Sequence, residues 1–126
     1  MMNRVLIVDD EPHVIRVLNL ALSRIGVKVD EAYNGVSALE YLQLQQPDAV
    51  ITDIDMPRMD GRTLCHKISE MFPDRAFPIV IMTARAELEH RDWARSIPNL
   101  TFMEKPLSIR KLIKSLSEHF LTDSER

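Results

Sequence analysis

The stretch VLIVDDE (residues 5–11) places four consecutive apolar residues directly before three carboxylates. A short, continuously apolar run of this kind is typical of a strand buried on both faces of a sheet. Two further runs share that character, AVI (49–51) and IVIM (79–82), whereas VKV (27–29) and LTFM (100–103) mix apolar with polar residues. Alternation indicates a half-exposed strand, so we place these last two runs at the edges of the sheet.

The segments between these runs carry apolar residues at helical spacing. The spacing predicts helices around residues 14–25, 38–42, 64–72 and 109–120, and a weaker one around 85–97. Strand and helix thus alternate five times, which is typical of an α/β protein whose parallel sheet is covered by helices on both faces. With the alternating runs at the two edges, the strand order becomes 2-1-3-4-5, the flavodoxin-like doubly wound arrangement.

The composition limits the classes of function. The chain has 126 residues with 16 Lys and Arg against 19 Asp and Glu, so its net charge is −3. This charge gives no electrostatic basis for binding nucleic acid, and no segment reaches the ~20 apolar residues of a membrane span. The one cysteine, Cys65, excludes an internal disulfide. We therefore expect one cytoplasmic domain over 1–121, without nucleic-acid or membrane contact, and a frayed polar tail at 122–126.

Polar side chains stand where four of the five strands are predicted to end. Asp9 and Asp10 follow the first run, Asp53 the third, Thr83 the fourth and Lys105 the fifth. One such residue alone is usually a turn or cap residue, but the carboxyl ends of parallel strands meet at one crevice. Carboxylates gathered there need a hard cation such as Mg²⁺, and an ammonium and a hydroxyl suit an anion beside it. These are the parts of phosphoryl transfer to an aspartate.

Four segments carry a resemblance to a known family. VLIVDDE (5–11), TDIDMPRMDG (52–61), VIMTA (80–84) and FMEKP (102–106) resemble, in order and spacing, the receiver domain of two-component response regulators. The resemblance implies a phosphorylation-dependent signalling switch, not an enzyme beyond its own phosphorylation and dephosphorylation. Its partners would be a histidine kinase or histidine phosphotransfer protein and an unidentified output partner or output domain. A phosphorylation-dependent dimer stays open, as does whether the receiver stands alone or belongs to a longer protein.

The resemblance assigns the phosphoryl chemistry to three residues. It makes Asp53 the phosphoacceptor and lets Lys105 and Thr83 hold the phosphoryl oxygens. Thr83 and Phe102 would then relay phosphorylation to the face formed by the 85–97 helix, the 100–103 strand and the last helix. In this family the bond before Pro106 is commonly cis.

A metal site is implied at the same place. The resemblance makes Asp10 and Asp53 ligands of Mg²⁺, for which Mn²⁺ can substitute, together with the backbone carbonyl of Asp55. Asp9 would act through a metal-bound water. No organic cofactor is expected.

Three further expectations concern the surroundings of this site. Gly61 is predicted to provide a positive φ angle in the loop before the 64–72 helix. Asp55 and Arg85 either form a salt bridge that obstructs water or simply point to solvent. Trp93 either packs on the sheet or faces a partner.

Two other protein classes use related parts. A haloacid-dehalogenase-like phosphatase also forms an aspartyl-phosphate, and Asp53-Ile54-Asp55 is a DxD, but that family places DxD after its first strand. A flavodoxin-like flavin carrier would need a phosphate loop rich in Ser, Thr and Gly after the first strand, where this chain has Asp-Asp-Glu-Pro.

Overall fold

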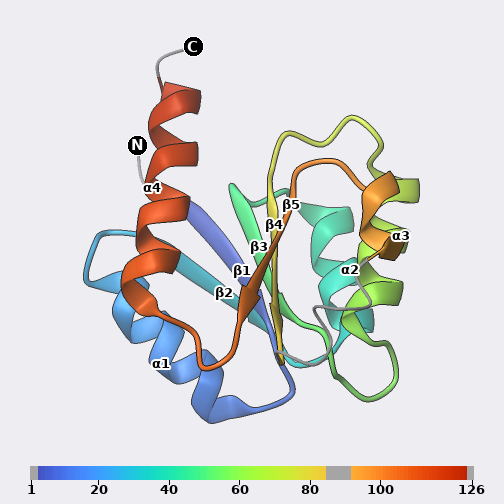
Figure 1. Ribbon diagram of the computed structural model, residues 1–126, viewed down its shortest axis with the longest axis horizontal. Helices are drawn as coiled ribbons and strands as arrows, with labels where there is room; N and C mark the ends of the chain where they lie inside the picture. The colour runs from blue at the N-terminus through green and yellow to red at the C-terminus, as the bar shows by residue number, and fades with distance from the viewer. Residues whose placement is uncertain (1–2, 85–91, 125–126) are drawn as a thin grey trace.

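The computed structural model describes residues 3–84 and 92–124, and within them a parallel sheet lies between two pairs of helices (Figure 1). The strands are β1 (Arg4–Val8), β2 (Lys28–Ala32), β3 (Ala49–Asp53), β4 (Ile79–Thr83) and β5 (Leu100–Glu104). The helices are α1 (Pro12–Ser23), α2 (Gly35–Leu44), α3 (Gly61–Met71) and α4 (Ile109–Ser124). The sheet order is β2-β1-β3-β4-β5, which confirms the doubly wound prediction.

The three central strands are buried and the two edge strands are half exposed, as their sequences predict. Alternate residues of a strand point to opposite faces, so each face of the sheet builds its own core. On one face, Leu6 and Ile81 pack with α2 and α3, including Cys65. On the other face, Ile7 and Val80 pack with α1 and α4. Among the described residues, two helices therefore cover each side and leave the carboxyl ends of the strands between them.

The helix predicted around 14–25 is found as α1, but only part of its apolar stripe is buried. Leu18 and Leu22 are buried, whereas Val17 is 56% exposed and Ile25, just beyond the helix, is also exposed. The apolar stripe of α1 is wider than the surface that the sheet and α4 cover, so its margin stays exposed. The strand predicted at 27–29 is likewise displaced, because β2 runs from Lys28 to Ala32.

Local signals set several of the helix ends. Pro12 lies in the first turn of α1, and Gly26, at φ 83°, adopts the left-handed conformation that follows the helix. Asn34 caps α2 by accepting a hydrogen bond from the Ser37 N–H at 2.8 Å. The last helix continues through Ser124, so residues 122–124 of the expected tail are helical; a domain end at 121 stays a prediction.

The predicted helix at 85–97 falls largely outside the described residues. Its described part, 92–96, forms a tight helical turn of the 3₁₀ type. Asn99, which precedes β5, has a φ of 56°, a conformation that Asn adopts more readily than most residues.

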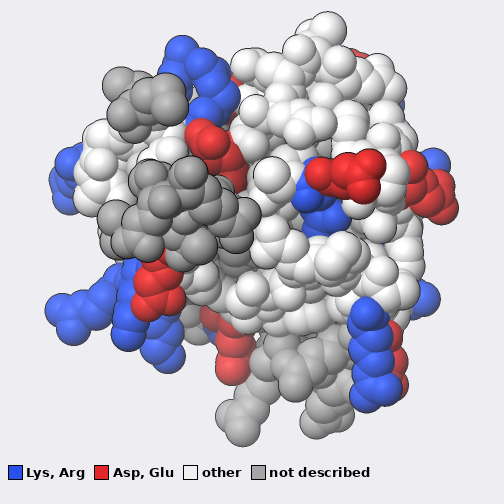
Figure 2. All heavy atoms as spheres, turned by 90° about the horizontal axis from the view of Figure 1, so that it is seen from above, with Lys and Arg blue, Asp and Glu red and all other residues white. Residues whose placement is uncertain are grey.

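On the face seen from above Figure 1, charged side chains are not gathered by sign. Figure 2 views the molecule from above Figure 1. It shows basic and acidic groups distributed over the described part of this face, with uncharged atoms between them. Across residues 3–84 and 92–124, no helix combines the length and the apolar character needed to cross a membrane.

Candidate phosphoacceptor and metal site

Asp9, Asp53, Thr83 and Lys105 lie at the carboxyl end of the sheet, the lower end in Figure 1. Asp53 is the last residue of β3 and Thr83 the last of β4, while Asp9 and Lys105 directly follow β1 and β5. The ladder extends past these ends, because the Asp9 N–H donates to the Ala32 carbonyl at 3.1 Å and the Lys105 N–H to the Thr83 carbonyl at 2.8 Å. Regular strand pairing thus fixes the backbone of each group.

Asp9 is a buried carboxylate with one oxygen engaged and one open. Asp9 as a residue is 1% exposed. Oδ1 accepts the Glu11 N–H at 2.9 Å, while Oδ2 has no hydrogen-bond partner among the described residues. Burial, followed by the charges of Asp53 and Asp10, raises the pKa of Asp9 to about 6 despite the opposing Glu11 hydrogen bond and Lys105 charge. A buried oxygen without a partner lowers the stability of the fold, and a bound cation would offset that cost.

Asp53 and Lys105 form the central ion pair of the crevice. Asp53 is 2% exposed, and its Oδ1 lies 2.6 Å from the Lys105 Nζ and accepts the Ile54 N–H at 3.0 Å. Burial raises the pKa of Asp53, and Lys105 opposes that rise. Burial would lower the pKa of Lys105, but its hydrogen bond to Asp53 and the surrounding carboxylates raise it. The Lys105–Pro106 peptide bond is cis. A group added to the Asp53 carboxylate would lie within reach of the ammonium.

The donor set fits a hard divalent cation. Carboxylate oxygens of Asp9, Asp10 and Asp53 all lie within 4.8 Å of one another, and Asp10 is exposed where the other two are buried. The atoms that these three carboxylates offer are all oxygens, as Mg²⁺ prefers, and the Asp9 Oδ2 is an acceptor without a partner among the described residues. The backbone carbonyl of Asp55 stays a predicted ligand.

Thr83 and Phe102 lie on adjacent strands but differ in surroundings. Thr83 is fully buried, and its hydroxyl donates to the Ala84 carbonyl at 3.2 Å. Phe102 is half buried and packs against the core on the α3 side of the sheet. Trp93 meets its ring edge-on, with centroids 5.8 Å apart. Of the two alternatives for Trp93, the structure therefore shows packing against the core.

The prediction that Gly61 provides a positive φ angle is wrong. Gly61 is the first residue of α3, and the left-handed residue of the loop is Arg58, at φ 69°. A Cβ at Gly61 would collide with the Asp53 carbonyl oxygen and lie 2.8 Å from the Ile54 Cα. The glycine is needed because the backbone of the acceptor passes so close to α3.

Two features near this sheet were not predictable from the sequence. One is a cluster in which Asp30 Oδ2 accepts hydrogen bonds from Arg4 at 2.7 Å and from Tyr41 at 2.6 Å. The other is a groove of about 320 Å³ between α1 and the segment after β5, bordered by Val17, Lys105 and other residues. Neither leaves a local sequence signal, because each joins residues distant in the chain.

The expected gate between Asp55 and Arg85 cannot be placed, because Arg85 lies outside the described residues. Asp55 itself is exposed. Its negative charge contributes to the raised pKa of Asp53.

This fold and this crevice define a doubly wound domain that presents a buried aspartate beside a lysine and an acidic cluster. Residues 5–117 match the family model of the response regulator receiver domain, and the chain belongs to that family. Receiver domains are signalling modules of two-component systems rather than classical enzymes, so neither the phosphatase nor the flavin-carrier alternative is retained.

Sequence and structure comparisons agree with this assignment. The chain is 34% identical over 110 residues to the response regulator MprA of Mycobacterium ulcerans, an alignment that covers 87% of this chain and 47% of that protein. A signal receiver domain of a histidine kinase from Syntrophus aciditrophicus is 26% identical with a TM-score of 0.83, over 93% of this chain and 89% of that one. The chemotaxis response regulator CheY4 of Vibrio cholerae is 25% identical with a TM-score of 0.83, over 94% and 99%. The chain spans about half the length of the curated relatives it matches.

Proposed function

We propose that this receiver domain accepts a phosphoryl group on Asp53 from a histidine kinase or histidine phosphotransfer protein, in a Mg²⁺-dependent reaction. The observation that carries the proposal is the 2.6 Å contact between Lys105 and a buried Asp53, beside an Asp9 oxygen with no partner among the described residues. In the reaction, a bond forms between an Asp53 oxygen and phosphorus as the bond from phosphorus to the donor nitrogen breaks. A cytoplasmic location, expected from the sequence, is part of this proposal.

The residues around Asp53 have separate tasks in this proposal. Lys105 holds a phosphoryl oxygen and offsets its charge, and the buried Thr83 binds a second oxygen after turning from its present bond to Ala84. Asp10 and Asp53 bind Mg²⁺ directly, and Asp9 orients a water bound to the metal. When bound, Mg²⁺ supplies positive charge that stabilises the oxygens of the transferring group.

The groove beside Lys105 supports delivery by another protein. It lies between α1 and the segment that carries Pro106 and Leu107, and Val17 borders it with more than half of its surface exposed. A protein that brings a phosphoryl group to Asp53 has to approach past Lys105. An apolar groove at that point provides surface to bury during the encounter.

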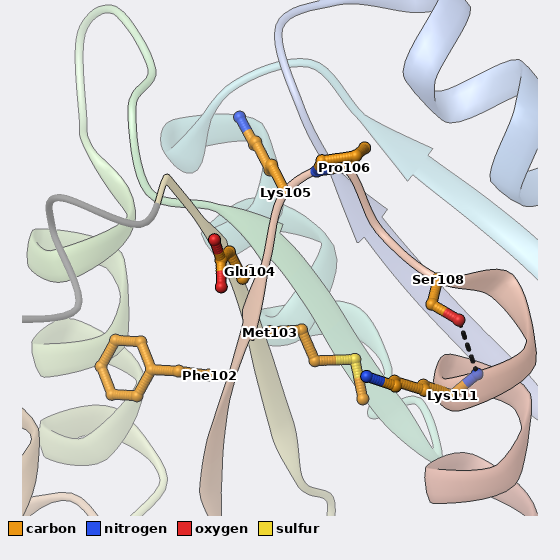
Figure 3. A pocket seen from close by; sticks show the side chains of 7 residues that line it. All are labelled: Phe102, Met103, Glu104, Lys105, Pro106, Ser108 and Lys111. Atoms are coloured by element: carbon orange, nitrogen blue, oxygen red, sulfur yellow. Dashed lines mark hydrogen bonds between the residues drawn. The ribbon is translucent and has the colours of Figure 1, made fainter.

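The output of the switch is proposed to pass through Thr83 and Phe102 to the face that contains β5 and α4. Figure 3 shows Phe102 and Met103 on opposite sides of β5, with Lys111 of α4 on the Met103 side. These residues border a hollow of about 450 Å³. Movement of Thr83 toward a phosphoryl oxygen would let Phe102 turn inward and change this face.

Two measurements test the proposal together. Acetyl phosphate with Mg²⁺ should add one phosphoryl group, seen by intact mass, and beryllium fluoride with Mg²⁺ should shift amide signals near residues 84–105 more than those near 28–46. Absent labelling contradicts the acceptor chemistry. Labelling with equal or reversed shifts contradicts only the route to the output face.

A further inference from the structure

Trp93 connects α3 to β5 through three ring contacts. Its ring meets Phe102 edge-on, at 5.8 Å between centroids and an interplanar angle of 77°. The His66 ring centroid lies 5.6 Å from that of Trp93, at an interplanar angle of 50°. The Arg62 guanidinium carbon lies 5.8 Å from the centroid of the Trp93 ring. Arg62 and His66 stand one turn apart on α3. One indole therefore joins a surface helix to the residue predicted to switch.

We propose that Trp93 is a positioning residue that holds the Phe102 ring in its present orientation and so opposes the switch to the phosphorylated state. The inference deepens the proposed function and rests on it. It adds a residue that sets how readily the Asp53 site is phosphorylated without touching the phosphoryl group.

The reason is that the Trp93–Phe102 contact belongs to one state of Phe102. Side chains change orientation by jumps between staggered rotamers, so a turn of Phe102 toward Thr83 would move its ring relative to Trp93. A contact made in one conformation alone shifts the equilibrium toward that conformation. An edge-to-face aromatic pair is strong enough to lower the population of the conformation with Phe102 turned inward by about 2- to 12-fold.

The start of α3 adds a link from the acceptor to this contact. Gly61 packs on the backbone of Asp53, and its N–H donates to the Ile54 carbonyl at 2.8 Å. The next residue is Arg62, whose guanidinium lies over Trp93. A cation over an indole face is attracted to it, so Arg62 helps to keep Trp93 against Phe102.

Trp93 is the one tryptophan in the sequence, so its fluorescence reports this contact directly. Beryllium fluoride with Mg²⁺ should change the emission of the wild-type domain. The change should be lost in Phe102→Leu, which removes the ring but keeps an apolar side chain. An emission that is unchanged in the wild type, or equally changed in Phe102→Leu, overturns the proposal.

Substitution tests the direction of the effect. Trp93→Leu keeps an apolar group without the ring and should raise the rate of phosphorylation by acetyl phosphate, measured by intact mass, by about 2- to 12-fold. Trp93→Phe restores an aromatic edge and should stay near the wild-type rate. Arg62→Gln should give a smaller increase, and its matched control Lys67→Gln, also exposed on α3, none. Equal rates for Trp93→Leu and the wild type overturn the proposal.

A structural role for Trp93 would give a different pattern. Leu39→Ala loosens the same core from α2, away from Phe102, and should leave the rate unchanged. In a Phe102→Leu background, Trp93→Leu should have no further effect, since the contact is already gone. An increase that persists there, or that Leu39→Ala reproduces, overturns the positioning role. Loss of labelling in the wild type would instead overturn the proposed function, and with it this inference.

Discussion

Two carboxylates near β1 lie in contrasting surroundings. Asp30, on β2, has its Oδ2 paired with both Arg4 and Tyr41, and these bonds outweigh its partial burial and lower its pKa. Asp9, at the other end of β1 from Arg4, is more deeply buried, has one oxygen unpaired among the described residues, and has its pKa raised to about 6. The Asp30 carboxylate is thus paired by two side chains, whereas the Asp9 carboxylate keeps one oxygen without a partner among the described residues.

The difference teaches how to separate structural from functional carboxylates in one small domain. A paired carboxylate stabilises the fold and needs nothing further. A buried carboxylate with raised pKa and an open oxygen costs stability, and folds retain such groups at sites that bind ligands. The contrast predicts opposite results when equivalent substitutions are made in the two places.

The largest expected effect is the loss of phosphorylation in Asp53→Asn. An amide cannot act as the acceptor, so labelling by acetyl phosphate with Mg²⁺ should disappear, as measured by intact mass. The matched control is Asp30→Asn, the same chemical change in the paired cluster. It should lower the thermal midpoint and keep labelling. Undiminished labelling of Asp53→Asn would contradict the acceptor assignment.

Metal binding should separate the two regions next. Mg²⁺ should raise the thermal midpoint of the wild type, since a ligand bound by the folded state stabilises it. Asp10→Ala and Asp9→Asn should weaken Mg²⁺ binding about tenfold or more, as losses within a metal's ligand shells do. Asp9→Asn should not reduce the stability of the metal-free domain, because burial disfavours the Asp9 charge more than its Glu11 hydrogen bond and Lys105 favour it.

The control for the metal prediction is Asp74→Ala, at an exposed carboxylate in the turn after α3. It should leave the Mg²⁺-induced rise in the midpoint unchanged, and EDTA should cancel that rise in every variant that shows it. If Asp9→Asn and Asp10→Ala bind Mg²⁺ as the wild type does, by calorimetry, the metal site is wrong.

A smaller effect is expected from the two glycines whose requirements differ. Gly61→Ala forces a methyl group against the backbone of Asp53 and Ile54, and overpacking of this kind costs about 1–3 kcal/mol. Because the displaced atoms belong to the acceptor, labelling should also slow. Gly26→Ala meets no atom within 4 Å but keeps a φ of 83°, which costs about 1–2 kcal/mol without affecting labelling. Urea unfolding and labelling rates of both variants check this.

The sequence predicts the fold and the site wherever an apolar strand run and the residue after it fix the position of a side chain. Apolar runs locate the strands, and the polar residue after each run then locates Asp9, Asp53, Thr83 and Lys105 at one crevice. Alternation in 27–29 and 100–103 correctly identified the edges, although β2 begins and ends later than its apolar pattern. Helix caps such as Asn34 are local features, because a cap bonds within its own turn.

The remaining features depend on contacts between distant segments. Nothing in the sequence near Gly61 indicates that the backbone at the end of β3 touches α3. The sequence therefore predicted a positive φ angle for this glycine, whereas close backbone packing is what requires it. Asp30 looks like an ordinary edge-strand residue until Arg4 and Tyr41 are placed beside it. For Trp93, the sequence left two environments open because the contact with Phe102 spans a loop.

The smallest expected effect is that of Tyr41→Phe, which removes one hydrogen bond from the paired cluster. It should lower the free energy of unfolding at pH 7 by about 0.5–1.5 kcal/mol and leave phosphorylation unchanged. Because the folded pKa of Asp30 is lowered, its contribution to stability is present above its unfolded pKa of about 4 and is lost as pH falls through the folded pKa. The difference between wild type and Tyr41→Phe should therefore be largest at neutral pH and shrink below about pH 4. Urea unfolding at several pH values measures it, and a difference that grows toward acid would show that the hydroxyl does not stabilise the charged carboxylate.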